Sequence, residues 1–289
     1  MTTLTLKKES SLWRDALRRM LSDRLTVLGL LLVGVALICA LFAPWIAPYG
    51  PIEGDLGTLY LKPPSPAHPF GTDDVGRDVL SRVIYGAQIS IKVSILAEAL
   101  GLVLGVVPGL IAGFYGGLVD TLIMRVVDLF LAFPLLIIAV ALVAAFGPNE
   151  TNIFVSLSLI IWPSIARLVR AQVLYLRETD YVAAARLIGA KDSQIMFAHI
   201  LPNMLTPLIV FTTLGIANVI LQEAALSFLG LGTADLTTPS WGKMLQEGRA
   251  FIRSAIWIPF YPGLAILLTV LGFNLLGDGL RDALDITSL

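Results

Sequence analysis

The feature that most constrains this chain is a series of six apolar runs, each near the roughly 20 residues that a helix needs to cross a bilayer. Inside a bilayer every backbone polar group must be satisfied internally, which single helices achieve. Only 14% of the residues are charged, against about 25% in soluble domains. The sequence therefore predicts an all-α polytopic membrane protein with six transmembrane helices. We place these spans at about 25–47, 88–113, 120–146, 152–172, 204–231 and 256–278.

The distribution of Lys and Arg predicts how the spans are oriented. Residues 1–24 are rich in cations and precede an apolar run that is longer than the roughly 7–15 residues of a cleaved signal peptide. With this segment inside, the cytoplasmic segments contain more Lys and Arg than the outside ones, as the positive-inside rule requires. We therefore expect both termini in the cytoplasm, together with a loop over 173–203 and a tail over 279–289.

Residues 48–87 form a polar excursion rich in Pro and Gly, which we expect to be extracytoplasmic. Asp78 is placed to cap a short helix. Its apolar stripe would rest on the membrane interface or on neighbouring helices. The stripe consists of Val79, Leu80, Val83 and Ile84. Residues 88–278 then form the main transmembrane domain of five helices.

The segment 180–203, DYVAAARLIGAKDSQIMFAHILPN, is mostly amphipathic and lies between two long apolar spans. We expect two short helices with a break. Asp180 would cap the first, Gly189 would end it in the left-handed conformation, and Asp192 or Ser193 would cap the second. Pro202 suits the first turn of the helix that follows.

Helical spacing predicts one small, apolar face on the first of these helices, formed by Tyr181, Ala184, Ala185 and Ile188. The alanines leave little side-chain bulk, so another backbone could approach closely. Two interpretations remain at this point. The segment is either a helix that lies on the bilayer surface, or a rigid element that a partner protein binds.

Enzyme signatures are missing from the sequence, which has no HExxH, no CxxC and no Ser-His-Asp set. A phosphate-binding loop is also missing, because Gly242-Lys243 is followed by Met244 and has Thr237 where the motif requires Gly. We therefore expect neither catalysis nor a cofactor on this chain.

Metal and nucleic-acid binding are not expected either. Cys39 is the only cysteine and lies in an apolar run, while His68 and His199 are too isolated to share a metal, so we expect no metal site. The net charge of −1 gives no argument for a nucleic-acid partner.

Two carboxylates fall at membrane depth, where ionisable groups are costly. Glu98 lies near the middle of the second span and Glu223 in the fifth. Either could belong to a solute path or a proton relay. The alternative for each is a buried carboxylate that pairs with another helix or with a partner subunit.

The 180–203 segment resembles the cytoplasmic coupling loop of ATP-binding-cassette importer permeases. Ala184 and Ala185 match the alanines of that loop, Gly189 its glycine, and Leu201-Pro202 its ending. Two positions depart from the pattern, because Ala183 replaces the usual glutamate and His199 the usual hydrophobic residue. The ending His-Ile-Leu-Pro-Asn is similar to that of the peptide and nickel branch.

Three further stretches resemble the C-type permease subunit of that branch. They are FGTDDVGRD at 70–78, EAALSFLGLG at 223–232 and FNLLGDGLRDALD at 273–285. The likeness covers about residues 25–285. It implies the type I importer permease fold and a multi-pass protein of the inner or plasma membrane of a bacterium or archaeon.

The resemblance also implies a set of partners. A second, homologous permease would form a heterodimer with this chain, two cytoplasmic ATPase subunits would bind ATP-Mg, and a solute-binding protein would land near 48–87 and 232–255. The first helix of the 180–203 segment would dock on one ATPase. The coupling residues implied are Asp180, Tyr181, Ala184, Ala185, Ile188, Gly189 and Ala190.

The function implied is ATP-driven import of dipeptides or oligopeptides, with nickel, glutathione or another small solute as the alternative cargo. A proton-coupled secondary transporter that uses Glu98 as its relay is a further alternative. It would need no ATPase, but it leaves the 180–203 segment unexplained, and the two halves of the sequence show no convincing repeat of the kind such transporters have.

Overall fold

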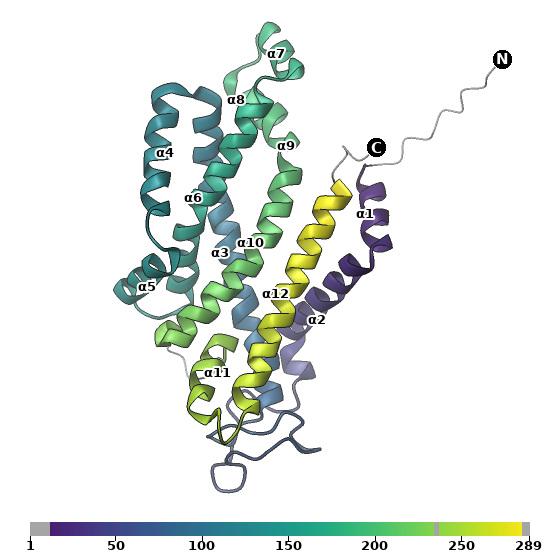
Figure 1. Ribbon diagram of the computed structural model, residues 1–289, viewed down its shortest axis with the longest axis vertical. Coiled ribbons are helices and arrows are strands. Elements are labelled where there is room, and N and C mark those ends of the chain that lie inside the picture. Colours follow the sequence, from purple (N-terminus) through teal and green to yellow (C-terminus); the bar gives the residue numbers. More distant parts are fainter. Residues whose placement is uncertain (1–11, 234–236, 285–289) are drawn as a thin grey trace, which may run out of the picture.

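A computed structural model describes residues 12–233 and 237–284 and confirms the all-α fold (Figure 1). Within these residues the extended structure is limited to two isolated β-bridges, Gly54 with Arg77 and Thr72 with Asp78. The helices are α1 Leu12–Ser22, α2 Arg24–Ile46, α3 Val79–Tyr115, α4 Gly117–Leu131, α5 Leu135–Phe146, α6 Glu150–Leu176, α7 Asp180–Leu187, α8 Asp192–Gln194, α9 Leu201–Asn203, α10 Leu205–Leu226, α11 Trp241–Gly248 and α12 Trp257–Leu284. π-Helical turns at Ile195–Ile200 and Ser227–Leu231 extend α8 and α10, and a 3₁₀ turn at Arg249–Phe251 follows α11.

Five of the described helices are long and apolar enough to cross a membrane, namely α2, α3, α6, α10 with its π-helical extension, and α12. The sixth expected span, 120–146, is broken into α4 and α5, which meet at an angle of 85°. Pro134 lies at the break as the N-cap residue of α5, and it has no N–H to continue the helix that precedes it. The predicted number of six spans is reached when this bent pair is counted as one.

The short helix after Asp78 and the span expected at 88–113 form one continuous helix, α3, so the predicted separation is wrong. Asp78 does cap it, because its Oδ2 accepts from the backbone N–H of Ser81 at 2.7 Å. Helix α3 continues through Gly86 without a turn. The missing side chain of this glycine makes room for Trp241 of α11. A Cβ there would lie 2.9 Å from Cδ1 of Trp241.

A stripe of glycines brings α3 and α6 into close contact. The glycines recur every four residues on one face of α3, and a Cβ on any of them would overlap α6. At Gly105, for example, it would lie 2.7 Å from the carbonyl oxygen of Trp162 and 2.7 Å from Cβ of Ile165. Small residues at such spacing let membrane helices approach closely. The stripe is Gly101, Gly105, Gly109 and Gly113, facing Ile161, Ile165, Val169 and Val173.

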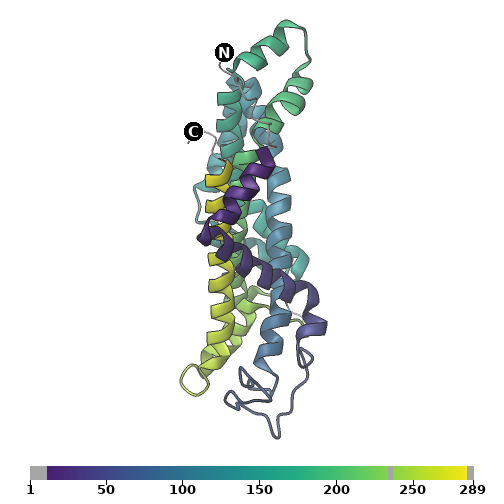
Figure 2. The same ribbon diagram turned by 90° about the vertical axis from the view of Figure 1, so that its right-hand side faces the viewer.

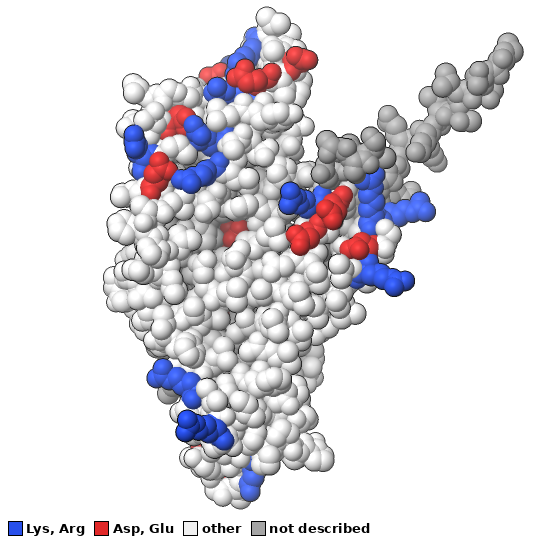
Figure 3. Space-filling view, in the orientation of Figure 1, with Lys and Arg blue, Asp and Glu red and all other residues white. Residues whose placement is uncertain are grey.

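The elements divide between two ends of an elongated molecule (Figures 1 and 2). The segment with α7 projects at one end, in the half that also contains α1 and the end of α12, and the loop 47–78 lies at the other. Figure 3 shows the Lys, Arg, Asp and Glu side chains mostly gathered toward the two ends, with a broad apolar band between them. Helix α1 was not predicted, and it packs on the end of α12 through Met20 and Ala283.

Candidate functional site

The projecting helix α7 begins one residue earlier than the sequence indicated. Thr179 occupies the N-cap position and Asp180 is the first helical residue, so the prediction that Asp180 caps the helix is wrong. The hydroxyl of Thr179 donates to the carbonyl of Leu176 at 2.5 Å instead of accepting from α7. Asp180 still places a negative charge in the first turn, where the helix dipole favours it.

Gly189 ends α7 as predicted, in the left-handed conformation with φ +81°. The N–H of Gly189 donates to the carbonyl of Arg186 at 3.0 Å, and that of Ala190 to the carbonyl of Ala185 at 3.0 Å. This pair of bonds is a Schellman motif, which gives the helix a firm end.

The second short helix also begins differently from expectation. Lys191 stands at the N-cap position of α8 and no side chain caps it, so neither Asp192 nor Ser193 has the predicted role. Pro202 does lie in the first turn of α9, as predicted.

The predicted single face of α7 is in fact divided between two faces. Ala185, 4% exposed, turns inward with Val182 and joins a buried cluster that includes Ile195 and Met204. The outward face keeps Tyr181, Ala184 and Ile188, and it gains Leu187, which is 88% exposed. Ala190 is partly buried against the inner cluster. Leu187 lies three residues after Ala184, so helical spacing alone would have indicated it.

Two arginines tie the α7 segment to the end of α3. The guanidinium of Arg186 lies 5.6 Å from the ring centroid of Phe114, within the range of a cation–π contact. Arg177, just before α7, donates from Nη1 to the carbonyl oxygen of Gly113 at 2.9 Å. Since α7 also packs on the π-helical turn that leads into α10, a displacement of α7 would be transmitted to both α3 and α10.

At the opposite end, a network of charges joins the loop 47–78 to α3 and α11. The carboxylate of Asp73 accepts from Nη1 of Arg82 at 2.6 Å and from Nε of Arg77 at 2.7 Å. Glu247 in α11 accepts from Nη2 of Arg82 at 2.9 Å. The side chains of Asp73 and Arg82 are 1% and 3% exposed, so they form a buried ion pair. Sequence reasoning missed this network, for which only the Asp73–Arg77 spacing of four residues gave a local signal.

Further contacts fix the rest of the loop. His68 Nδ1 lies 3.0 Å from a carboxylate oxygen of Asp78, and Trp257 Nε1 donates to the carbonyl of Thr72 at 3.0 Å. Burial raises the pKa of the Asp74 carboxyl, and repulsion from Asp73 adds to the rise. The motif at 70–78 thus builds a rigid platform at this end of the molecule.

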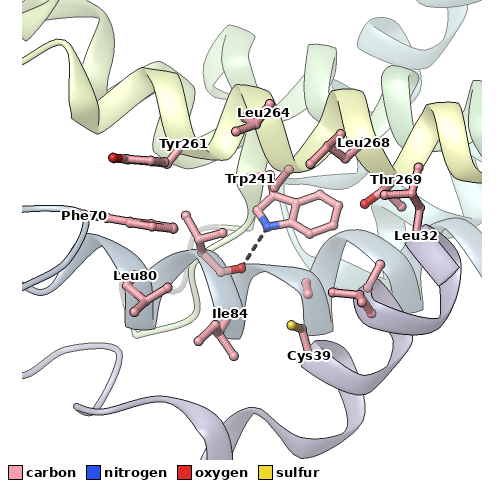
Figure 4. A pocket seen from close by; sticks show the side chains of 15 residues that line it. Leu32, Cys39, Phe70, Leu80, Ile84, Trp241, Tyr261, Leu264, Leu268 and Thr269 are labelled. Atoms are coloured by element: carbon pink, nitrogen blue, oxygen red, sulfur yellow. Dashed lines mark hydrogen bonds between the residues drawn. The ribbon is translucent and has the colours of Figure 1, made fainter. Parts of the chain in front are cut away.

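A cavity of about 530 Å³ lies beside this platform, between α2, α3 and α12 (Figure 4). The indole of Trp241 forms one wall and donates from Nε1 to the carbonyl of Val83 at 2.9 Å. The residues that line the cavity are largely apolar and include no Asp, Glu, Lys or Arg. A charged solute would find no counter-charge in its walls.

The two carboxylates predicted at membrane depth have different surroundings. Glu223, 1% exposed, accepts from the hydroxyl of Ser227 at 2.8 Å, and the hydroxyl of Ser240 lies 3.4 Å from that of Ser227. It belongs to a polar cluster that joins α10 to the start of α11. Glu98, 4% exposed, forms no hydrogen bond or ion pair with the described residues, and its Oε1 is buried without a partner.

Comparison with known families matches both parts of the chain. Residues 105–286, more than half of the sequence, match the family described as the binding-protein-dependent transport system inner membrane component. Residues 11–64 match the N-terminal transmembrane domain of oligopeptide transport permease C. These matches confirm the resemblance that the sequence motifs indicated.

Individual proteins are similar over nearly the whole chain. The dipeptide transport system permease protein DppC of Escherichia coli is 55% identical over 265 residues, which are 90% of this chain and 88% of that protein. DppC of Alkalihalophilus pseudofirmus is 45% identical over 94% of this chain and 89% of its own. The di/tripeptide permease DppC of Pseudomonas aeruginosa is 46% identical over 89% and 86%. The chain therefore belongs to the family of binding-protein-dependent transport system inner membrane components.

Proposed function

We propose that this chain is a transmembrane permease subunit of an ATP-driven importer that moves dipeptides or oligopeptides into the cell. The observation that carries the proposal is the identity of 45% to 55% with dipeptide permeases over about nine tenths of the chain. The proposal excludes the alternative cargoes, which were nickel, glutathione or another small solute.

The assembly that we propose has four kinds of component. A second, homologous permease forms a heterodimer with this chain, and two cytoplasmic ATPases bind ATP-Mg, for which this sequence has no phosphate-binding loop. A solute-binding protein lands on the end that carries the loop 47–78 and α11. Substrate crosses between the two permeases.

In this assembly α7 is the contact with one ATPase. Its exposed face of small and apolar side chains fits a groove, and its Schellman end and buried inner face support its use as a rigid lever. Closure of the ATPase pair would displace α7, and the contacts with α3 and α10 would carry that displacement into the membrane.

Uptake of a labelled dipeptide tests the cargo and the energy source together. The chain is expressed with its partner subunits and binding protein in cells that lack their own peptide importers. We expect uptake that requires ATP, persists when an ionophore collapses the proton gradient, and resists competition by nickel or glutathione. Uptake that stops with the ionophore while ATP is maintained would favour the proton-coupled alternative.

Cysteine labelling tests the orientation. With Cys39 replaced by Ala, single cysteines are introduced at Ala67, in the loop 47–78, and at Ser193, beside α7; both positions are exposed. A membrane-impermeant maleimide added to intact cells or spheroplasts should label position 67 and leave position 193 unlabelled until the membrane is opened. The reverse pattern would contradict cytoplasmic placement of α7.

A further inference from the structure

Glu98 carries a carboxylate that has no hydrogen-bond or ion-pair partner in the part of the chain that the structure describes. It lies near the middle of the 37-residue helix α3, is 4% exposed, and has Oε1 buried with no hydrogen bond. An ionisable group at membrane depth without a partner is costly, and such groups mark substrate or ion pathways. Glu223 differs in part, since its Oε1 accepts from the hydroxyl of Ser227 four residues on, although its Oε2 is also buried without a partner among the described residues.

The position opposite Glu98 is a glycine of α10. A Cβ on Gly215 would lie 2.6 Å from Cδ of Glu98, so any other residue there would displace the carboxylate. The space that the carboxylate occupies between α3 and α10 therefore depends on Gly215.

The face of the molecule formed by α4 and α6 carries an exposed ion pair. Arg167 in α6 and Asp128 in α4 form an ion pair at 2.6 Å, and their side chains are 55% and 56% exposed. At 1.5 Å per residue, Asp128 lies about 16 Å along α4 from Gly117, and Arg167 about 14 Å from the end of α6. An exposed ion pair of this kind is more stable beside water or protein than beside acyl chains.

The cations of neighbouring helices do not neutralise Glu98. Lys92, on the same helix, pairs with Glu150 at 2.7 Å, Arg167 pairs with Asp128, and Arg170 pairs with Asp120. A counter-charge to the ionised form of Glu98 would come from outside residues 12–233 and 237–284. The cargo of the proposed importer has one, because the α-amino group of a peptide has a pKa of about 8 and is protonated at neutral pH.

We propose that Glu98 binds the positively charged amino group of the peptide as it passes through the membrane. This inference rests on the proposed function and names the residue that recognises the cargo within it. The carboxylate becomes accessible when α10 moves away from α3 at Gly215. The π-helical turn on which α7 packs leads through α9 into α10, so a displacement of α7 caused by ATP binding would open this contact.

The first test uses the whole complex in proteoliposomes, with the solute-binding protein and labelled dialanine outside and ATP at the ATPases. Glu98→Gln keeps the shape of the side chain and removes its charge, while Glu98→Asp keeps the charge. We expect uptake by Glu98→Gln to fall at least tenfold with the complex intact, and Glu98→Asp to retain more uptake than Glu98→Gln. The wild-type complex tests the proposed function by itself: if it takes up no dialanine, the proposed function is wrong, whatever the Glu98 variants do.

The second test measures direct binding by saturation-transfer NMR on the purified complex without the solute-binding protein. The probes are dialanine and lactyl-alanine, in which a hydroxyl replaces the amine. The wild type should prefer dialanine, and Glu98→Gln should bind the two equally. The inference would be overturned if the Glu98→Gln complex took up dialanine at the wild-type rate. It would also be overturned if the wild type bound both probes equally. So would loss of the second permease from the Glu98→Gln complex, because the carboxylate would then serve the contact between subunits.

Discussion

The guanidinium of Arg82 in α3 donates to the carboxylate of Glu247 in α11 across 2.9 Å, although 165 residues separate them in the chain. The same guanidinium holds Asp73 of the loop 47–78 at 2.6 Å. One buried cation thus connects three segments at the end of the molecule where we place the binding-protein contact. The platform depends on charges that are satisfied only when all three segments are in place.

Replacement of Arg82 by Met should therefore destabilise the platform strongly. Loss of Arg82 leaves the buried Asp73 carboxylate with Arg77 as its remaining cation, so the cost should approach but not exceed the roughly 3–5 kcal/mol of a fully broken buried pair. We expect a clearly lower apparent melting temperature of the detergent-solubilised protein. Arg249→Met, at an exposed position just after α11, is the matched control and should melt like the parent. Equal melting of Arg82→Met and the parent would show that the network adds no stability.

A second prediction concerns the glycine stripe between α3 and α6. Gly105→Leu places a side chain where the backbone of α6 lies, and overpacking of this kind costs about 1–3 kcal/mol or more. The variant should show a lower yield of folded protein and a lower melting temperature. Gly34→Leu in α2 meets no atom within 4 Å of its Cβ and should behave like the parent. If both variants behave alike, the close approach of α3 and α6 is not what the stripe provides.

A third prediction follows from the raised pKa of Asp74. The folded state holds this proton more tightly than the unfolded state, so stability falls as pH rises from about 4 toward the raised value. Asp74→Asn should accordingly be more stable than the parent at pH 7, and the two should converge below about pH 4. Hydrogen bonds from Thr58 and Gly57 lower the pKa of Asp55, so Asp55→Asn should show the opposite sign at pH 7. Melting temperatures across this pH range check both, and no gain by Asp74→Asn at pH 7 would contradict the prediction.

The sequence predicted the parts of this fold that depend on local chemistry. Asp78 caps α3 and Gly189 ends α7 in the left-handed conformation, because each role needs only a residue type at the right place beside a helix. The apolar runs gave the spans for the same reason. The break between α4 and α5 was hidden by an apolar run that continues through Pro134, a residue that membrane helices often tolerate.

The features that depend on distant partners were beyond sequence reasoning. Nearly every position from 181 to 188 is small or apolar, so periodicity did not distinguish the two faces of α7. The inner face was decided by Ile195 and Met204, which pack on Val182 and Ala185 only after the chain has turned back. The pairing of Arg82 with Glu247 has no local signal at all. Both carboxylates at membrane depth looked alike in the sequence, and only the neighbouring serine hydroxyls separate Glu223 from Glu98.

The end of α7 provides a fourth prediction. Gly189 has φ +81°, a conformation that β-branched residues rarely adopt, and a Cβ there meets nothing within 4 Å. Gly189→Val should therefore abolish dipeptide uptake while the protein stays in the membrane, because the Schellman motif is lost. Gly189→Asn adds a side chain that tolerates this conformation, so uptake should be retained. Normal uptake by the Val variant would count against a rigid α7.

The outward face of α7 provides the last prediction. Ala184 is exposed beside Tyr181 and Ile188, and Arg at this position would add bulk and charge to the centre of the surface that we propose docks on an ATPase. We expect Ala184→Arg to remain folded in the membrane, since its Cβ points away from the inner cluster, and to lose the ATPase subunits on affinity purification in mild detergent. Ser193→Arg places the same charge in the same segment outside α7, at another exposed position, and should keep them. If Ala184→Arg retains the ATPases as well as Ser193→Arg does, this face of α7 is not the docking surface. If both variants lose the ATPases, the added positive charge on the segment is responsible. A local contact at α7 would be disturbed only by the change at position 184.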